Sequence, residues 1–437
     1  MNIIVVGTGY VGLVSGACLA EIGHTVTCVD IDQKKIDALK NGKIPIFEPG
    51  LETMVMNNVQ SGHLRFTTKL AENFADAEVV VIAVGTPSRP DGHADLQYVY
   101  AVAEEIGAQI TDYTVVVNKS TVPVGTGRAV EDIIRKTYSG EFAVVSCPEF
   151  LREGSAVDDF MHPDRIVIGT RNDRAAKVML DLFAKIKGEK LVTTVESAEI
   201  IKYASNAFLA TKISFINEIA HLCERAGGDI EEVAYGIGLD QRIGPKFLSA
   251  GIGWGGSCFP KDVRALEQIG GLHGYDFRLL KAVIEVNNHQ RMHFVEKMKE
   301  HFGGSVNGKR IAVLGLAFKG NTDDVRESAA IDIISALVKE GATVSAFDYE
   351  AVTNTKQVLA DVPVDYAVDP YAAVAGADAV VIATDWPQFK DLDWKRISQT
   401  VGTPVVFDGR NMFNPQRMRS EYGFTYYSIG RPSATVA

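Results

Sequence analysis

The fold of this chain is decided by one stretch near its N-terminus, NIIVVGTGYVG at residues 2–12. Residues 3–6 are all β-branched, as expected of a strand that is buried on both faces of a sheet. Glycines follow at Gly7, Gly9 and Gly12, and a helix is expected over residues 13–21. A second strand, at residues 25–29, ends in Asp30. This order of strand, G-x-G-x-x-G, helix, strand and acidic residue predicts a dinucleotide site of the Rossmann type.

Each residue of this motif has a physical role. Gly7 makes the tight turn, Gly9 lets the backbone approach a pyrophosphate, and Gly12 allows close packing of helix on strand. The helix N-terminus binds the phosphates through its N–H groups and its dipole. Asp30 would accept hydrogen bonds from ribose hydroxyls and repel a 2′-phosphate, so the expected cofactor is NAD and not NADP.

Polar residues follow three further apolar strands, at residues 77–84, 114–118 and 143–145. Thr86, Thr121, Glu149 and Glu153 stand at or just beyond the carboxyl ends of these strands. Ligands of an open parallel sheet bind at that edge, which makes the four residues candidates for a site. The alternative is that they only form turns and cap helices.

Residues 198–226 contain few helix breakers and predict one long helix. Its apolar residues cover more than one stripe, so the helix is buried on several sides, either in a core or in a dimer interface. Glu199, Lys202 and Asn206 share one polar face by their spacing. That face is either solvated or, if buried, in need of hydrogen-bond partners.

The chain also contains an internal repeat. Residues 308–319 again form a strand that runs into a glycine turn, with a helix expected at 328–340 and a strand at 343–347 before Asp348. The segment ADAEVVVIA at 75–83 is echoed by GADAVVIA at 376–383. We therefore predict an α/β protein with two Rossmann-like, doubly wound parallel-sheet domains joined by a long central helix. The second copy lacks the later glycines and carries Lys319 and Arg326 in its loop, which suits phosphates better than a second dinucleotide.

A second motif carries chemistry, GWGGSCFPKD at residues 253–262. Pro260 suits the first turn of a helix, so Cys258 is expected just before a helix N-terminus. That position, with Lys261 nearby, favours the nucleophilic thiolate. The alternative is a buried structural cysteine. In the preceding segment, residues 231–252, two polar runs that contain glycine, 240–244 and 247–251, are interpreted as a lid, a binding loop or a surface connection.

Two other segments are predicted to be peripheral. Residues 42–51 contain two prolines before a helix and by composition form a surface connection. Residues 430–437 are expected to be a frayed tail.

Composition narrows the class of protein. The 437 residues are 46% hydrophobic and 23% charged, with a net charge of −11, which disfavours nonspecific nucleic-acid binding. The five cysteines have no C-x-x-C and no metal-ligand spacing, so we expect a reducing compartment, no disulfides and no metal. Because we see neither a signal peptide nor a membrane-length apolar run, we expect a soluble cytoplasmic enzyme without membrane or nucleic-acid partners.

In several motifs, the chain resembles the UDP-glucose/GDP-mannose dehydrogenase family over nearly its whole length. The most specific motifs are GGSCFPKD at 255–262 and KSTVP at 119–123. The same resemblance is supported by PEFL at 148–151, by Lys202 with Asn206, and by DGRN at 408–411. The resemblance implies a two-step oxidation of the C6 alcohol of a nucleotide sugar to a carboxylate, with reduction of two NAD. Cys147 departs from the Asn or Ser expected before Pro148, and Trp254 occupies a position where other aromatic residues occur.

The resemblance also implies roles in the first oxidation. Asp262, through water with Thr121, removes the hydroxyl proton as hydride leaves. Lys202 and Asn206 stabilise the developing oxyanion.

In the second oxidation, Cys258 adds to the aldehyde to give a thiohemiacetal, which is then oxidised to a thioester. Glu149 orients or activates the water that hydrolyses the thioester. The residues expected at NAD are Gly7, Gly9, Tyr10, Val11, Gly12, Asp30, Lys35, Thr86, Thr121, Glu153, Lys261 and Arg326. Those expected at the nucleotide sugar are Glu149, Phe150, Leu151, Arg152, Glu153, Lys202, Asn206, Arg242, Phe247, Leu248, Ser249, Ala250, Gly251, Gly255, Lys319 and Arg410.

The implied organisation has three domains: an NAD-binding domain at 1–196, a central helical dimerisation domain with the cysteine loop at 197–300, and a UDP-sugar-binding domain at 301–437. Arg242 is expected to reach the substrate of a neighbouring subunit in a homodimer or larger oligomer. Residues 44–51 and 241–244 favour UDP-glucose over GDP-mannose or UDP-N-acetylmannosamine. A simple hydroxyacid dehydrogenase would have no use for Cys258, and a non-catalytic binding protein would have lost Cys258, Lys202 or Asp262.

Overall fold

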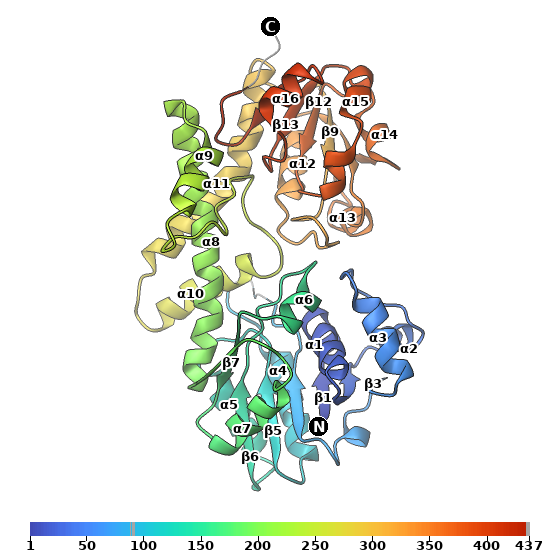
Figure 1. Ribbon diagram of the computed structural model, residues 1–437, viewed down its shortest axis with the longest axis vertical. Coiled ribbons are helices and arrows are strands. Elements are labelled where there is room, and N and C mark those ends of the chain that lie inside the picture. Colours follow the sequence, from blue (N-terminus) through green and yellow to red (C-terminus); the bar gives the residue numbers. More distant parts are fainter. Residues whose placement is uncertain (88, 90–91, 434–437) are drawn as a thin grey trace. The chain divides into compact units, whose positions relative to one another are not determined.

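The structure is a computed structural model that describes residues 1–87, 89 and 92–433 (Figure 1). It divides into two units, one made of residues 1–205 and 264–275 and the other of residues 206–263 and 276–437. Two helices carry the chain from one unit into the other, α8 (Val195–Ala226) and α10 (Phe259–Leu272).

The first unit contains an eight-stranded sheet with the strand order β3-β2-β1-β4-β5-β6-β7-β8. Strands β1 to β6 are parallel, whereas β7 runs antiparallel to β6 and parallel to β8. The first six strands therefore have the order of a dinucleotide-binding fold. The strands are β1 (Asn2–Val6), β2 (Thr25–Val29), β3 (Leu64–Thr67), β4 (Val79–Ile82), β5 (Thr114–Asn118), β6 (Phe142–Ser146), β7 (Arg165–Gly169) and β8 (Glu189–Thr193).

Helices bury both faces of this sheet, because alternate residues of each central strand point into two separate apolar clusters. One cluster takes Ile3, Val5 and Val81, and the other takes Ile4, Val6 and Val80. The first face is covered by α1 (Tyr10–Glu21), α2 (Gln33–Lys40), α3 (Leu51–Gln60), α6 (Ala156–Met161) and α7 (Asp173–Leu182). The second is covered by η1 (Ala71–Asn73), α4 (Gln97–Gln109) and α5 (Thr126–Arg135).

The second unit contains a six-stranded parallel sheet with the order β11-β10-β9-β12-β13-β14. This repeats the order of β1 to β6, so the internal repeat seen in the sequence is a repeat of topology. The strands are β9 (Arg310–Leu314), β10 (Thr343–Phe347), β11 (Val364–Tyr366), β12 (Ala379–Ile382), β13 (Val405–Asp408) and β14 (Thr425–Ser428).

The two faces of this second sheet are covered by different sets of helices (Figure 1). Packed into one apolar cluster are α8, α9 (Ile230–Gly238), α11 (Arg278–His301), α12 (Ala329–Lys339) and the ends of α13 (Val352–Val358). Packed into the other are α14 (Pro370–Val374), η2 (Pro387–Asp391), α15 (Trp394–Thr400) and α16 (Pro415–Ser420).

The predicted fold class is confirmed: two doubly wound α/β sheets are joined by the long helix α8. The parallel prediction does not extend to β7, which turns back against β6. Just before the predicted loop runs the structure forms helix α9, which the sequence analysis did not predict. The tail prediction is wrong for Gly430 and Arg431, because Gly430 donates to Glu224 and Arg431 is buried, whereas residues 434–437 lie outside the described residues. Across the described chain, no helix has both the length and the apolar character of a membrane span.

Candidate active site

The glycine turn between β1 and α1 has the geometry that a pyrophosphate needs. Gly7 has a φ of 101°, and a Cβ there would lie 2.6 Å from the Ala83 carbonyl oxygen. A Cβ on Gly12 would lie 1.9 Å from the Gly7 carbonyl oxygen, so helix and turn are in close contact. A Cβ on Gly9 would meet no protein atom within 4 Å, and α1 has no side-chain cap and no acidic residue in its first turn. Open space before uncapped N–H groups fits the phosphates of NAD.

Asp30 closes this turn from the end of β2. Its Oδ2 accepts from the Thr8 backbone N at 2.8 Å and the Thr8 Oγ1 at 2.7 Å. Lys35 Nζ lies 3.1 Å from the same oxygen, which brings two predicted NAD residues together. Burial would raise the pKa of Asp30, but the hydrogen bonds from Thr8, Asp32 and Lys35 together hold it below its usual value. Asp30 is therefore ionised, as an acceptor for ribose hydroxyls must be.

The carboxyl ends of β4 and β5 are tied together by their polar residues. Thr86 Oγ1 donates to the Thr121 carbonyl at 2.9 Å, and Ser120 Oγ donates to the Val84 carbonyl at 2.7 Å. The two threonines predicted to lie at NAD are thus neighbours.

Glu149 and Lys202 form a buried ion pair. Lys202 Nζ on α8 lies 2.9 Å from Glu149 Oε1, and both side chains are about 95% buried, with exposures of 4% and 5%. Glu149 Oε2 accepts from the Leu151 backbone N at 2.6 Å. Burial would raise the pKa of Glu149, but the Lys202 ammonium, the Leu151 N–H and Lys119 lower it. The structure therefore holds a carboxylate and an ammonium together within the first unit.

Glu199, on the same helix, is buried but has a different role. Its two oxygens accept from the backbone N of Gly125 at 2.7 Å and of Gly127 at 2.8 Å, at the start of α5. Burial raises its pKa to about 7. The predicted polar face of α8 is therefore not solvated, and Glu199 caps a neighbouring helix.

In the second unit, Cys258 directly precedes helix α10. The Asp262 backbone N donates to the Cys258 carbonyl at 2.8 Å, which makes Cys258 the N-cap residue. The predicted position of Cys258 is thus confirmed. It is partly exposed, whereas the other four cysteines are buried, and its Sγ lies 3.5 Å from Ser257 Oγ. An accessible thiol at a helix N-terminus is the arrangement expected of a nucleophile.

Asp262 in the first turn of α10 has two side-chain partners. Asn206 Nδ2 donates to Asp262 Oδ2 at 2.6 Å, and Lys261 Nζ lies 2.5 Å from Asp262 Oδ1. The Asp262 side chain is 1% exposed. The structure thus brings Asn206 and Lys261, two predicted site residues, into contact with the buried carboxylate of a third, Asp262, which lies four residues after Cys258.

Three family models match the chain in succession. They are the NAD binding domain of the UDP-glucose/GDP-mannose dehydrogenase family at residues 1–187, its central domain at 196–289 and its UDP binding domain at 312–415. The chain belongs to the UDP-glucose/GDP-mannose dehydrogenase family. It uses NAD as its cofactor, as the sequence predicted.

Individual relatives agree over the full length. A UDP-glucose 6-dehydrogenase of Bacillus subtilis is 52% identical over 99% of this chain and 94% of its own. A solved UDP-glucose dehydrogenase of Pyrobaculum islandicum is 41% identical with a TM-score of 0.92, over 99% of this chain and 98% of that one. A solved UDP-D-ManNAc dehydrogenase of Pyrococcus horikoshii is 27% identical with a TM-score of 0.85, over 99% of both chains.

The remaining family-implied arginines have partners within the structure. Arg152 pairs with Asp159, Arg326 with Asp324, and Arg242, 88% exposed, with Asp240. Lys319 Nζ lies 5.5 Å from the Phe318 ring centre.

Arg410 contacts the backbone of its own unit. It donates to the carbonyls of Ala383 and Phe318, each at 2.8 Å. It therefore joins the chain beyond β9 to the chain beyond β12, and its contact with substrate stays a prediction.

The segment at 247–256 is fixed by close backbone contacts. Phe247 has a φ of 64°, Leu248 and Ala250 are buried, and the Gly251 N donates to Asn217 Oδ1 at 2.9 Å. A Cβ on Gly255 would lie 2.1 Å from the Glu327 carbonyl oxygen, so this glycine is required by packing.

Sequence reasoning missed the residues that support this segment. Asn287 on α11 accepts from the Trp254 N at 2.8 Å and donates to the Trp254 carbonyl at 3.0 Å, and Arg291 Nη2 donates to the same carbonyl at 3.0 Å. Gln290 Nε2 donates to the Gly251 carbonyl at 2.7 Å. The sequence did contain a signal for them: Asn287, Gln290 and Arg291 lie close together in one helix, and such polar groups need hydrogen-bond partners when they are buried.

Glu48 was also missed, and the interpretation of residues 42–51 as a mere surface connection is wrong for it. It is buried and hydrogen-bonded to the Tyr10 hydroxyl, and it accepts from the backbone N of Gly154 and of Ala156, each at 2.8 Å. Burial and the Glu48 carboxylate raise the pKa of Tyr10. Glu48 thus fastens the segment after Glu149 to the start of α1.

Proposed function

We propose that the chain oxidises UDP-glucose at C6 to UDP-glucuronate in two steps, with the release of two NADH. The observation that carries this proposal is Cys258, a partly exposed N-cap thiol in a chain whose family is a dehydrogenase family. The full-length relatives at 41% and 52% identity act on UDP-glucose by name, and the one that acts on an N-acetylated sugar is 27% identical. This supports UDP-glucose over its siblings.

When bound, NAD accepts hydride from C6 in each oxidation. In the first, Asp262, with Thr121 through water, takes the hydroxyl proton. The Lys202 ammonium and a second N–H of the Asn206 amide stabilise the oxyanion. The contacts of Asp262 with Asn206 and Lys261 support this role, because they fix the carboxylate as a buried acceptor.

In the second oxidation, Cys258 Sγ forms a bond to the aldehyde carbon and the carbonyl oxygen takes a proton. The thiohemiacetal loses hydride and a proton to give a thioester. Water then attacks the thioester carbon, the C–S bond breaks, and the products are the carboxylate and the free thiol. Glu149 is proposed to accept hydrogen bonds from that water, and its ion pair with Lys202 supports this role because it keeps the carboxylate ionised. A covalently held aldehyde does not escape between the two steps.

The remaining site residues are proposed in their sequence-derived roles. Those at NAD are Gly7, Gly9, Tyr10, Val11, Gly12, Asp30, Lys35, Thr86, Thr121, Glu153, Lys261 and Arg326. Those at the nucleotide sugar are Glu149 to Glu153, Lys202, Asn206, Arg242, Phe247 to Gly251, Gly255, Lys319 and Arg410. The three-domain division at 1–196, 197–300 and 301–437 stays a proposal with them.

We also propose a homodimer built on α8. Phe208, Phe215 and Leu222 recur every seven residues on this helix and are 65%, 53% and 57% exposed. A heptad of large apolar residues on a 32-residue helix is a seam for a second helix. The exposure of Arg242 is consistent with its predicted reach to a neighbouring subunit. Five free thiols support a reducing compartment such as the cytoplasm.

The test is the ratio of NADH formed to sugar consumed, with limiting UDP-glucose and parallel reactions on GDP-mannose and UDP-N-acetylmannosamine. We expect two NADH per UDP-glucose and no free aldehyde. Two NADH from another sugar would keep the mechanism and correct the substrate. One NADH from every sugar, with free aldehyde, would refute the thiol chemistry.

A further inference from the structure

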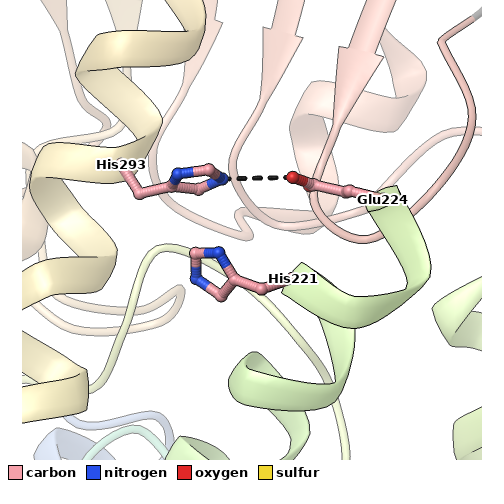
Figure 2. A group of neighbouring side chains, drawn as sticks. All are labelled: His221, Glu224 and His293. Atoms are coloured by element: carbon pink, nitrogen blue, oxygen red, sulfur yellow. Dashed lines mark hydrogen bonds and ion pairs between the residues drawn. The ribbon is translucent and has the colours of Figure 1, made fainter. Parts of the chain in front are cut away.

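A cluster of metal-ligating side chains lies away from the thiol, on helices α8 and α11 of the second unit. His221 and Glu224 are three residues apart on α8, and His293 faces them from α11 (Figure 2). One ligand atom from each of the three side chains lies within 4.8 Å of the other two. The rings of His221 and His293 have centres 4.1 Å apart.

The hydrogen bonds of Gln290 fix the tautomer of His221. Gln290 Nε2 donates to the Gly251 carbonyl at 2.7 Å, so its Oε1 is the atom that faces His221 Nε2 at 2.6 Å. Because an amide oxygen only accepts, His221 Nε2 carries the proton and Nδ1 carries the lone pair.

Glu224 is oriented in the same way. Its Oε1 lies 2.5 Å from Lys297 Nζ and accepts from the Gly430 N at 2.7 Å. Its Oε2 faces His293 Nε2 at 3.1 Å (Figure 2). One carboxylate oxygen is therefore held by donors, while the other points at the two imidazoles.

We propose that His221 Nδ1, Glu224 Oε2 and His293 Nε2 bind one divalent transition-metal ion that prefers imidazole ligands, with Zn²⁺ as the best fit. Two imidazoles and one carboxylate form a three-ligand Zn²⁺ set that leaves the fourth position to water. Binding needs the Nε2 lone pair of His293, so the proton that Nε2 donates to Glu224 moves through solvent to Nδ1 and the ring binds as a neutral imidazole. Tetrahedral Zn²⁺ needs ligand atoms about 3.4 Å apart. Glu224 Oε2 and His293 Nε2 already lie 3.1 Å apart, and no separation in the cluster exceeds 4.8 Å, so the widest closes by at most about 1.4 Å.

The surroundings of the three ligands match what metal sites require. Ligating imidazoles donate their other N–H to a fixed acceptor, as His221 does to Gln290, and ligating carboxylates are themselves hydrogen-bonded. His293 and Glu224 are 32% and 18% exposed, so an ion has access from solvent. The Lys297 ammonium opposes a cation, but it lies on the far oxygen of Glu224 and is shared with the Ser428 carbonyl at 2.7 Å.

The consequence is structural and not catalytic. An ion here would join α8 to α11, and Glu224 would join both to the segment after β14 through Gly430. Gln290 links His221 directly to Gly251, in the segment predicted to contact the nucleotide sugar. Occupancy of the site would therefore stiffen the support of that segment.

The experiment uses the full chain without an affinity tag, stripped of metal by a chelator. Co²⁺ is titrated and followed by its visible absorption, and bound Zn²⁺ is counted by equilibrium dialysis. We expect one Zn²⁺ fewer per chain in His221→Ala and in His293→Ala than in the wild type, together with loss of the Co²⁺ band. Gln290→Ala should weaken Zn²⁺ binding about 10- to 100-fold. Counting the difference separates this site from the thiols.

The matched control is His162→Ala, which removes an exposed histidine paired with Asp158 in the first unit. It should leave the Zn²⁺ count unchanged. If the alanine variants do not fold, modification of the wild type by diethyl pyrocarbonate replaces them, and Zn²⁺ should protect His221 and His293. An equal Zn²⁺ count in wild type and variants, or no protection of the two histidines, would overturn the proposal.

Discussion

Replacing Asn287 with alanine should separate the support of the cysteine loop from its chemistry. Asn287 lies on α11, is not itself among the predicted substrate or NAD residues, and exchanges two hydrogen bonds with the backbone of Trp254. Trp254 is four residues before Cys258. The variant therefore removes a positioning residue and leaves the thiol in the chain.

The size of the effect follows from the partners that remain. The Trp254 carbonyl keeps Arg291 Nη2 at 3.0 Å, whereas the Trp254 N–H loses its buried acceptor. One buried, unpaired N–H costs about 1–3 kcal/mol. For a unit of this size, a loss of about 2 kcal/mol lowers Tm by about 4–8 °C. A thiol misplaced by about 1 Å reduces kcat about 100-fold.

The assay has a convenient reporter and a matched control. The three tryptophans, Trp254, Trp386 and Trp394, are all in the second unit, so their fluorescence follows unfolding of that unit. Asn288→Ala removes the adjacent, exposed asparagine of the same helix. We expect Asn287→Ala to lose kcat and Tm with an unchanged Kd for NAD, and Asn288→Ala to change none of them. Equal kcat in the two variants would show that Asn287 does not position the loop.

Further variants test other parts of the molecule. Cys258→Ser should lose net turnover and stop after the first oxidation or at a slowly hydrolysed ester, which product analysis would detect. If the proposed dimer forms through α8, Phe215→Glu should lower the mass seen by light scattering from that of a dimer to that of a monomer, and an unchanged mass would remove α8 as the interface. Folding lowers the pKa of Glu224 from 4.5 to about 2. The ionised carboxylate therefore stabilises the fold by about 3 kcal/mol above pH 4.5, and this stabilisation is lost as the pH falls towards 2. Urea unfolding at pH 6 and pH 3 should show that loss in the wild type and not in Glu224→Gln. Glu48→Gln leaves one acceptor oxygen for two backbone N–H groups. It should therefore lower the free energy of unfolding by about 1–3 kcal/mol and raise KM for the sugar.

The fold was predictable because its signals are local. Each central strand is a short run rich in β-branched residues. The turn after β1 is marked by glycines, and Gly7 and Gly12 are required there by the backbone geometry. The antiparallel direction of β7 was not predictable, because the apolar sequence of a strand that is buried on both faces does not indicate in which direction the strand runs. Helix α9 was missed because it contains glycines at 236 and 238, and glycine is more common in loops than inside helices.

The site was predictable where a reactive residue stands next to a local sequence signal for its structural position. Cys258 before Pro260 at a helix start is such a case. Glu48 and Asn287 were not, because their partners are backbone groups that lie 106 and 33 residues away. Nothing in a sequence marks which backbone N–H groups will lack a partner once the chain has folded. The pairing of His221 with His293 has the same origin, since it depends on the register of α11 against α8.

The two sheets show why topology alone does not assign the cofactor. Asp348 ends β10 as Asp30 ends β2, in sheets of the same strand order. Yet Asp348 is 2% exposed, and its Oδ2 already accepts from the Leu316 N at 2.6 Å and from Trp386 Nε1 at 3.0 Å. A ribose hydroxyl would have to displace a buried indole. The same acidic position is thus proposed to bind the ribose of NAD in the first sheet, whereas in the second it packs its own domain, so the chemistry of each unit follows from its side chains and not from its fold.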